Sequence, residues 1–227
     1  MNKKIASRQK VNINSVRSVV RYLNQFSGVD LKKLIINHYQ KKEFPYLNKT
    51  ETWVAIQAKG NHGLIGHFIE DYFFGTTPNN KAERDLPCAE LKSIRVKKDK
   101  FGRYRIKDAL KITKANRNDL VHKTFGRHNA LQSKLKQIVV IYVDHENFKL
   151  IRAIPLELKN KDLVQARKDY KRMALFAQKS GNLFSSKSYG QTPTDSVITL
   201  RSQRDKKNFL MTAQTLKRYH QEKLFCV

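Results

Sequence analysis

The residues of this chain best suited to chemistry are Glu90, Leu91 and Lys92, with Asp85 five positions upstream and Glu70 at the polar edge of an apolar segment. In an extended strand the side chains alternate between two faces, so Glu90 and Lys92 are expected to project together while Leu91 points into the core. Carboxylates and an amine would then share one pocket. Such a group can hold a divalent metal ion beside a lysine, the arrangement needed to attack a phosphodiester bond with water.

The charge of the chain points to a phosphate-rich partner. Its 227 residues include 46 Lys and Arg against 19 Asp and Glu, which gives a formal net charge of +27. A field of this sign and size favours nucleic acid, although a ribosomal or chromatin-type packing protein or a peripheral membrane protein would share it. No apolar run is long enough to span a membrane, and two cysteines are too few for a disulfide framework. We therefore expect a cytoplasmic protein without a membrane anchor.

The elements that must position these residues are predicted from apolar periodicity. The N-terminal part is expected to contain two helices joined at Ser27-Gly28, a loop over residues 42–52, and a buried helix over 63–74 that ends at Gly75. The motif itself is expected to follow as a strand and a hairpin, with the segments 89–96 (strand), 97–102 (turn) and 103–113 (partner strand).

The second half predicts two paired strands followed by a long helix. Residues 138–143 form a continuous β-branched run typical of a central strand, with 150–156 as its hairpin partner. The remaining expectations are a helix over 161–179, an exposed loop over 182–196, a short strand over 197–200 and a final helix over about 208–224. This order predicts an α/β fold with a central mixed sheet flanked by helices. We expect a single domain over 1–227, either undivided or in two lobes that divide near residue 160.

Several segments together resemble the MutH family of DNA endonucleases, within the PD-(D/E)xK nuclease superfamily. The catalytic signature of that family is similar to residues 63–75, 81–85 and 89–94. Two further segments also resemble the family. They are the Ser-Gly junction in 23–31 and, in 133–139, a Lys-Leu-Lys run that leads into a core strand. The family includes a hemimethylation-directed mismatch-repair nickase and related type II restriction enzymes that cut at GATC. The resemblance implies a restriction-endonuclease-like core with two lobes around a DNA cleft.

The resemblance also implies roles for individual residues. Glu70, Asp85 and Glu90 would be the metal-binding acids, Lys92 the catalytic lysine and Lys134 a second active-site lysine, with Mg²⁺ as the metal and Mn²⁺ as a substitute. Glu70 could instead be a satisfied polar residue at the edge of a core helix.

The second acid of the predicted metal site has two candidates. The MutH nickases place this acid seven positions before the Glu of Glu-Leu-Lys, which selects Glu83. The local Lys-x-Glu-x-Asp similarity, and the five-position spacing of restriction enzymes of the MvaI and BcnI kind, select Asp85. We favour Asp85 and keep Glu83 as the alternative.

Basic and polar residues along the chain are candidates for contacts with DNA, mostly with its phosphates. The candidates are Arg103, Arg105, Arg127, His128, Lys136, Tyr189, Gln191, Arg201, Arg204, Lys206 and Lys207. The last of these fall where family members read the site and sense adenine methylation, and residues 206–209 resemble a Lys-Lys-Asn-Phe stretch of the family. The aromatic residue that usually precedes that stretch is absent.

The sequence therefore predicts a Mg²⁺-dependent, sequence-specific DNA endonuclease, with a type II restriction enzyme preferred. One alternative is a MutH-like nickase of mismatch repair, and another is a non-catalytic basic protein that coats nucleic acid. The expected partners are double-stranded DNA, a second copy of the chain on the DNA and, for a restriction enzyme, a cognate methyltransferase.

Overall fold

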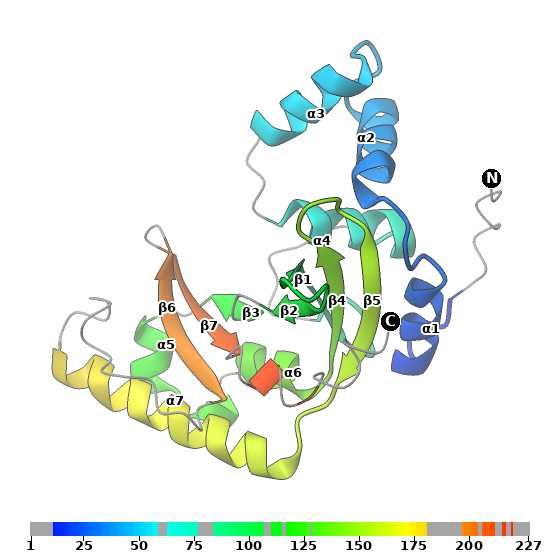
Figure 1. Cartoon of the computed structure of the whole chain (residues 1–227). Coiled ribbons are helices and arrows are strands. Elements are labelled where there is room, and N and C mark those ends of the chain that lie inside the picture. The colour runs from blue at the N-terminus through cyan, green and yellow to red at the C-terminus, as the bar shows by residue number, and fades with distance from the viewer. Residues whose placement is uncertain are drawn as a thin grey trace.

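We describe a computed structural model of the chain, which covers residues 11–58, 63–76, 84–106, 110–114, 117–127, 129–180, 197–203, 206–211, 215–216 and 219. Groups of helices and groups of strands follow one another along it (Figure 1). The α-helices are α1 (Val16–Asn24), α2 (Leu31–Lys42), α3 (Lys49–Ala58), α4 (Leu64–Ile69), α5 (Arg117–His122), α6 (Asn129–Lys136) and α7 (Asn160–Ser180). The strands are β1 (Glu90–Lys98), β2 (Tyr104–Ile106), β3 (Leu110–Lys114), β4 (Ile138–Asp144), β5 (Leu150–Leu156), β6 (Ile198–Gln203) and β7 (Lys206–Met211).

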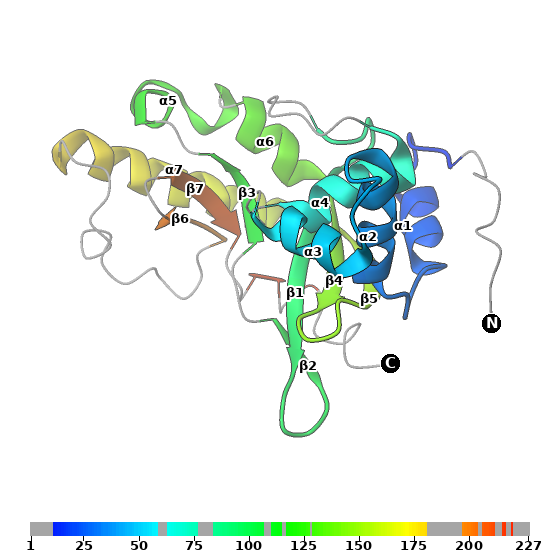
Figure 2. The same ribbon diagram turned by 90° about the horizontal axis from the view of Figure 1, so that it is seen from above.

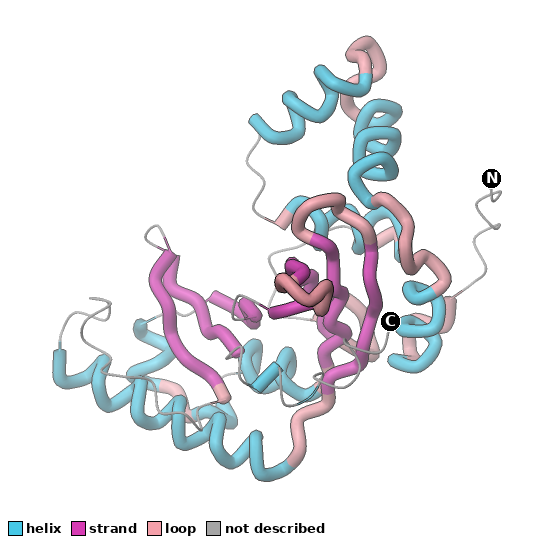
Figure 3. The backbone as a smooth tube through the Cα atoms, viewed as in Figure 1, coloured by secondary structure: helices cyan, strands magenta, loops and turns pink. Residues whose placement is uncertain are grey.

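The main sheet has the strand order β2-β1-β4-β5. Figure 3 shows the strands in magenta and the helices around them in cyan. Strands β1 and β4 run parallel, whereas β2 and β5 pair antiparallel with their neighbours. All seven residues of β4 are buried, because this strand is covered on both faces and paired on both edges. The predicted α/β fold with a central mixed sheet and flanking helices is confirmed.

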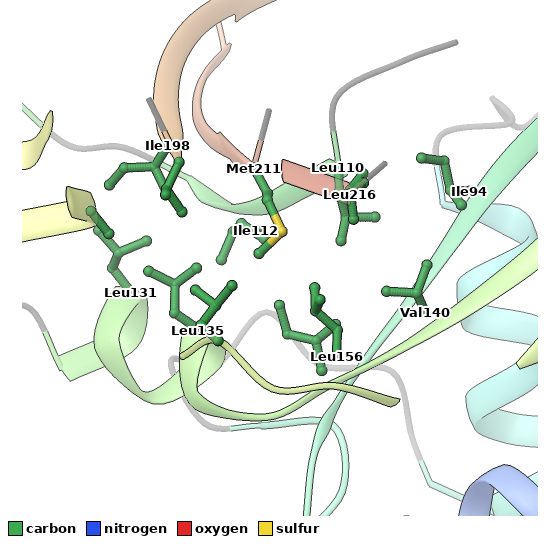
Figure 4. Packing of buried hydrophobic residues seen from close by; sticks show 14 of the residues in the cluster. Ile94, Leu110, Ile112, Leu131, Leu135, Val140, Leu156, Ile198, Met211 and Leu216 are labelled. Atoms are coloured by element: carbon green, nitrogen blue, oxygen red, sulfur yellow. The ribbon is translucent and has the colours of Figure 1, made fainter. Parts of the chain in front are cut away.

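Alternate residues of β4 face two separate hydrophobic clusters. Val139, Ile141 and Val143 pack with the N-terminal helices α1 to α4. Residues 138, 140 and 142 face the other way, toward α5, α6, α7 and a second sheet. Figure 4 shows part of this second cluster, with Val140 and Leu156 of the main sheet opposite Met211 and Ile198. The sheet is thus held between two layers.

The junction between the first two helices is fastened to the edge strand β5. Gly28 has a φ of +82°, which favours glycine, and its N–H donates to the carbonyl of Leu150 at 2.7 Å. The side chain of Asn24 makes hydrogen bonds to both the N–H and the carbonyl of Ala153. The predicted pair of helices with a Ser-Gly joint is therefore present, and the joint places both helices against the sheet.

One predicted loop is partly wrong. The segment 42–52 was expected to be a loop, but α3 begins at Lys49. Asn48 accepts hydrogen bonds from the N–H groups of Thr50 and Glu51, while the Glu51 carboxylate accepts from the N–H of Asn48. This reciprocal capping starts a helix immediately after the turn that contains Pro45.

The second sheet corrects two further expectations. Its order is β3-β7-β6, all antiparallel. The predicted partner strand 103–113 is in fact two strands, since β2 pairs with β1 for only three residues and β3 joins the second sheet. The helix expected from Asn208 is wrong over 208–211, which belong to β7; pairing with strands on both sides outweighs the helical propensity of its residues.

Other predicted segments agree with the structure or lie beyond its description. Helix α7 spans 160–180, close to the expected 161–179, while the expected loop 182–196 falls outside the described residues. Among the helices that the structure describes, none is long and apolar enough to cross a bilayer. The proposed division into two lobes stays a prediction.

Candidate active site

Strand β1 positions Glu90 and Lys92. In the parallel register with β4, Glu90 lies opposite Ile138 and Lys92 opposite Val140. Leu91 between them is buried in the cluster of the N-terminal helices. The Glu90 side chain is fully buried, whereas 22% of the Lys92 side chain is exposed, and Lys92 Nζ donates a hydrogen bond to Glu90 Oε1. The alternation expected from the sequence is confirmed, because Glu90 and Lys92 share one side of the strand.

The loop before β1 brings Asp85 to the same place. Asp85 Oδ2 accepts a hydrogen bond from the N–H of Leu91 at 2.9 Å, which fixes the carboxylate beside the first residues of the strand. Lys92 Nζ lies 3.7 Å from the same oxygen. Lys92 is thus held between the carboxylates of Asp85 and Glu90.

Lys134 reaches the cluster from the last turn of α6, and its Nζ donates to Glu90 Oε1 at 2.9 Å. As the sequence predicted, the Lys-Leu-Lys run leads into a core strand, since β4 begins at Ile138; the run itself is the helical end of α6. Residues two apart on a helix point in nearly opposite directions. Lys134 is therefore buried against Glu90, while Lys136 is exposed.

The two oxygens of Glu90 have different surroundings. Oε1 accepts from both lysines, Lys92 and Lys134. Oε2 is buried and has no hydrogen-bond partner among the residues that the structure describes. Burial of an unpaired carboxylate oxygen is costly, and such an atom in a protein calls for an explanation such as a bound ion.

Glu70 approaches the cluster from the layer of helices. It begins a single π-helical turn (Glu70–Phe74) that continues α4. Gly66 lies next to both Glu70 and β1, since a Cβ atom built at Gly66 would make ordinary contacts of 3.9 Å with Glu70 Oε1 and with Ser93 Oγ. Burial, and next the negative charge of Asp85, raise the pKa of Glu70 to about 7, against the opposing influence of the lysines.

The donor set of the cluster fits a hard divalent cation. Glu70, Asp85 and Glu90 supply three carboxylates against the two ammonium groups of Lys92 and Lys134, and one buried oxygen of Glu90 is unpaired. Such cations prefer carboxylate oxygens. The three carboxylates do not yet form a complete set of metal ligands. Within the described parts of the chain, no three Asp, Glu, His or Cys side chains lie close enough together to hold a metal ion.

A charged network next to Glu70 was missed in the sequence. His38 Nε2 and Lys42 Nζ, both on α2, lie 3.0 and 2.6 Å from Asp71 Oδ2. The hydrogen bond from Lys42 is the main reason that the pKa of Asp71 is lowered. The network joins α2 to the turn that carries Glu70. The one signal available was the spacing of His38 and Lys42, which puts both on one helix face.

The structure places some of the predicted DNA-contact residues on named elements. Arg103 and Arg105 are exposed on the hairpin between β1 and β2. The strands β6 and β7 contain Arg201, Lys206 and Lys207, and Arg127 lies in a short 3-10 helix (Phe125–Arg127), but their side chains are not described. The other candidates, together with Glu83, lie outside the described residues: His128, Tyr189, Gln191 and Arg204.

Comparison with family models matches residues 74–173 to the family described as DNA mismatch repair enzyme MutH. The matched segment contains Asp85, Glu90, Lys92 and Lys134, and it begins four residues after Glu70. The match supports membership of the chain in the MutH-like nucleases. No curated protein matches the chain closely enough to be reported as a relative. The match agrees with the resemblance in the sequence, and the matched family suggests a DNA endonuclease.

Proposed function

We propose that this protein is a Mg²⁺-dependent, sequence-specific DNA endonuclease of the type II restriction class. The observation that carries the proposal is the cluster in which Lys92 contacts both Glu90 and Asp85 while Lys134 contacts the same oxygen of Glu90. The net charge of +27 supports DNA as the substrate, because it neutralises phosphates along a bound duplex.

The carboxylates of Glu70, Asp85 and Glu90 would hold the metal ion. Bound Mg²⁺ supplies a Lewis acid for the scissile phosphate and lowers the pKa of the attacking water. Ionisation of Glu70, whose pKa is about 7, makes its carboxylate available at neutral and higher pH. The unpaired Oε2 of Glu90 has a free acceptor site for the same ion.

The two lysines have separate tasks in this proposal. Lys92 is partly exposed, so its ammonium group can reach a substrate phosphate and offset the charge that develops there, or orient the attacking water. Lys134 is buried and acts through Glu90, whose carboxylate it holds in position. Lys134 is therefore a positioning residue.

A restriction enzyme and a repair nickase differ in what activates them. The matched family is described as a mismatch repair enzyme, which favours the nickase as the second candidate. The aromatic residue that usually precedes the Lys-Lys-Asn-Phe stretch of the family is absent before residue 206, and this departure from the family pattern favours restriction. One active site cuts one strand at a time, so double-strand cleavage would require a dimer or two successive binding events. A restriction enzyme would also have a cognate methyltransferase.

Plasmid cleavage tests the proposal. Purified protein should cut unmodified plasmid in Mg²⁺ or Mn²⁺ without any other protein, and EDTA should stop cleavage. Lys92→Ala should reduce the cleavage rate by at least about 100-fold and leave DNA binding within a few-fold of the wild type. Binding that is indifferent to EDTA, with no cleavage in either metal, would instead identify a non-catalytic coating protein. Cleavage that requires added mismatch-repair proteins would identify a nickase.

A further inference from the structure

The hairpin that joins β1 to β2 displays a phenylalanine between two cations. Phe101 is 66% exposed at the tip. Lys100 Nζ and the guanidinium carbon of Arg103 each lie 5.0 Å from the centre of its ring. A single exposed apolar side chain is common on proteins. An aromatic ring with cations stacked against it is more specific, since it presents an apolar face and positive charge at one point.

The tip is held in one shape by its own hydrogen bonds. Asp99 Oδ1 accepts from the N–H groups of Phe101 and Arg103, at 2.9 and 3.0 Å, while Asp99 Oδ2 accepts from Arg105 Nε at 2.8 Å. Gly102 has a φ of +77° and donates its N–H to the carbonyl of Asp99. The ring is therefore presented by a preformed turn, which lowers the entropic cost of binding through it.

The charge around the tip indicates which class of partner would bind there. Residues 95–105 contain six basic residues and one acidic residue, Asp99. Because the carboxylate of Asp99 is already engaged within the turn, the charge available to a partner is positive. Proteins that bind nucleic acid combine cations, which contact phosphates, with aromatic rings, which stack on a base or enter a base step. The tip presents both kinds of group.

Strand β1 connects the tip to the candidate active site. Lys92 and Lys98 are six residues apart on the same side of β1, a separation of about 20 Å in an extended strand. That length corresponds to about six base pairs of duplex DNA. Figure 2 shows the hairpin projecting beyond the rest of the sheet, where a duplex held at the active site could meet it.

We propose that the tip of the β1–β2 hairpin is a second DNA-binding site, in which Phe101 stacks on a base step of duplex DNA while Lys100 and Arg103 contact the flanking phosphates. Its spacing from the cleaved bond, about six base pairs to Lys98 at the base of the turn and more to Phe101, rests on the proposed function. The contact itself does not require catalysis, so it can be measured in EDTA.

Tryptophan fluorescence tests the stacking contact directly. The chain has one tryptophan, Trp53, so the double variant with Trp53→Phe and Phe101→Trp carries a single reporter at the tip. A duplex of about 24 base pairs, added in EDTA, should quench that emission by about half or more. The matched control is Trp53→Phe with Tyr46→Trp, because Tyr46 is 97% exposed and lies away from the hairpin, between α2 and α3. Its emission should change little.

Binding affinity provides a second measurement that does not depend on the Trp53→Phe background. Phe101→Ala should weaken duplex binding about tenfold, as expected for loss of one stacking contact. Lys100→Gln should lower the slope of log affinity against log salt by about 0.9, as expected for one lost phosphate contact. Tyr46→Ala should change neither quantity.

The outcomes separate this proposal from the endonuclease proposal. Unchanged affinity for Phe101→Ala, together with equal quenching at positions 46 and 101, would overturn the hairpin contact, and a protein partner would then be the better explanation for the exposed ring. Plasmid cleavage in Mg²⁺ is measured on the same preparations. Cleavage without a contact at the tip overturns only the present inference, whereas a contact at the tip without unaided cleavage overturns the restriction-type endonuclease and leaves the DNA-binding site intact.

Discussion

Replacement of Glu70 by glutamine should stabilise the metal-free protein at alkaline pH and abolish cleavage. In the folded chain, burial and the nearby carboxylates raise the pKa of Glu70 from 4.5 to about 7. Above pH 7 the folded wild type must therefore carry a carboxylate in surroundings that disfavour it. Glutamine has nearly the same shape without the charge, so the variant avoids this cost.

The size of the effect follows from the shift in pKa. A full shift of this extent corresponds to about 3 kcal/mol. Glu70 is only half-buried, and solvent screening reduces the cost, so we expect Glu70→Gln to be more stable by about 1–2 kcal/mol at pH 8. A raised pKa favours the folded state below the unfolded value of 4.5 and loses that advantage as pH rises toward 7. The difference between variant and wild type should therefore vanish near pH 4.5 and grow between pH 4.5 and 7.

Urea unfolding in EDTA at several pH values measures this difference. Glu157→Gln, which changes an exposed carboxylate after β5, is the matched control and should have no such effect. Added Mg²⁺ should stabilise the wild type at pH 8 but stabilise Glu70→Gln much less, because a metal ligand is lost. A stability difference that is constant with pH, or a variant less stable than the wild type at pH 8, would refute the electrostatic account of Glu70.

Three further predictions concern the residues that position the site. Lys134→Met should lower the free energy of unfolding by about 2–3 kcal/mol at neutral pH, because the buried Glu90 carboxylate then keeps Lys92 but loses Lys134 as a partner. Lys136→Met, at the exposed neighbouring position, is the control and should change the free energy of unfolding by less than about 0.5 kcal/mol. Equal effects of the two variants in urea unfolding would contradict the buried contact. Gly75→Ala should cost about 1 kcal/mol, because Gly75 ends the helical segment at a φ of +65°, and Gly75→Asn should cost less. Asn24→Ala should cost about 1–3 kcal/mol through two lost hydrogen bonds to β5, a loss that should appear as faster amide exchange in α1.

The sequence alone determined those features that depend on neighbouring residues. The alternation in β1 places Glu90 and Lys92 on one side, since it follows from the geometry of any extended strand. The Ser-Gly joint and the stop at Gly75 follow from backbone preferences of single residues. The five-residue spacing also brought Asp85 to the start of the strand, where it accepts the N–H of Leu91. A capping signal at Asn48 was equally local, although it was not recognised as the start of α3.

The tertiary structure decided which distant residues complete the site. Lys134 lies 44 residues from Glu90, and only the parallel pairing of β1 with β4 brings the end of α6 beside that carboxylate. The strand at 206–211 has the composition of a helix, but partners on both edges make it β7. The raised pKa of Glu70 depends on burial and on charges from other elements. These features depend on contacts between segments far apart in the chain, whose energies exceed local preferences and leave no periodic pattern in the sequence.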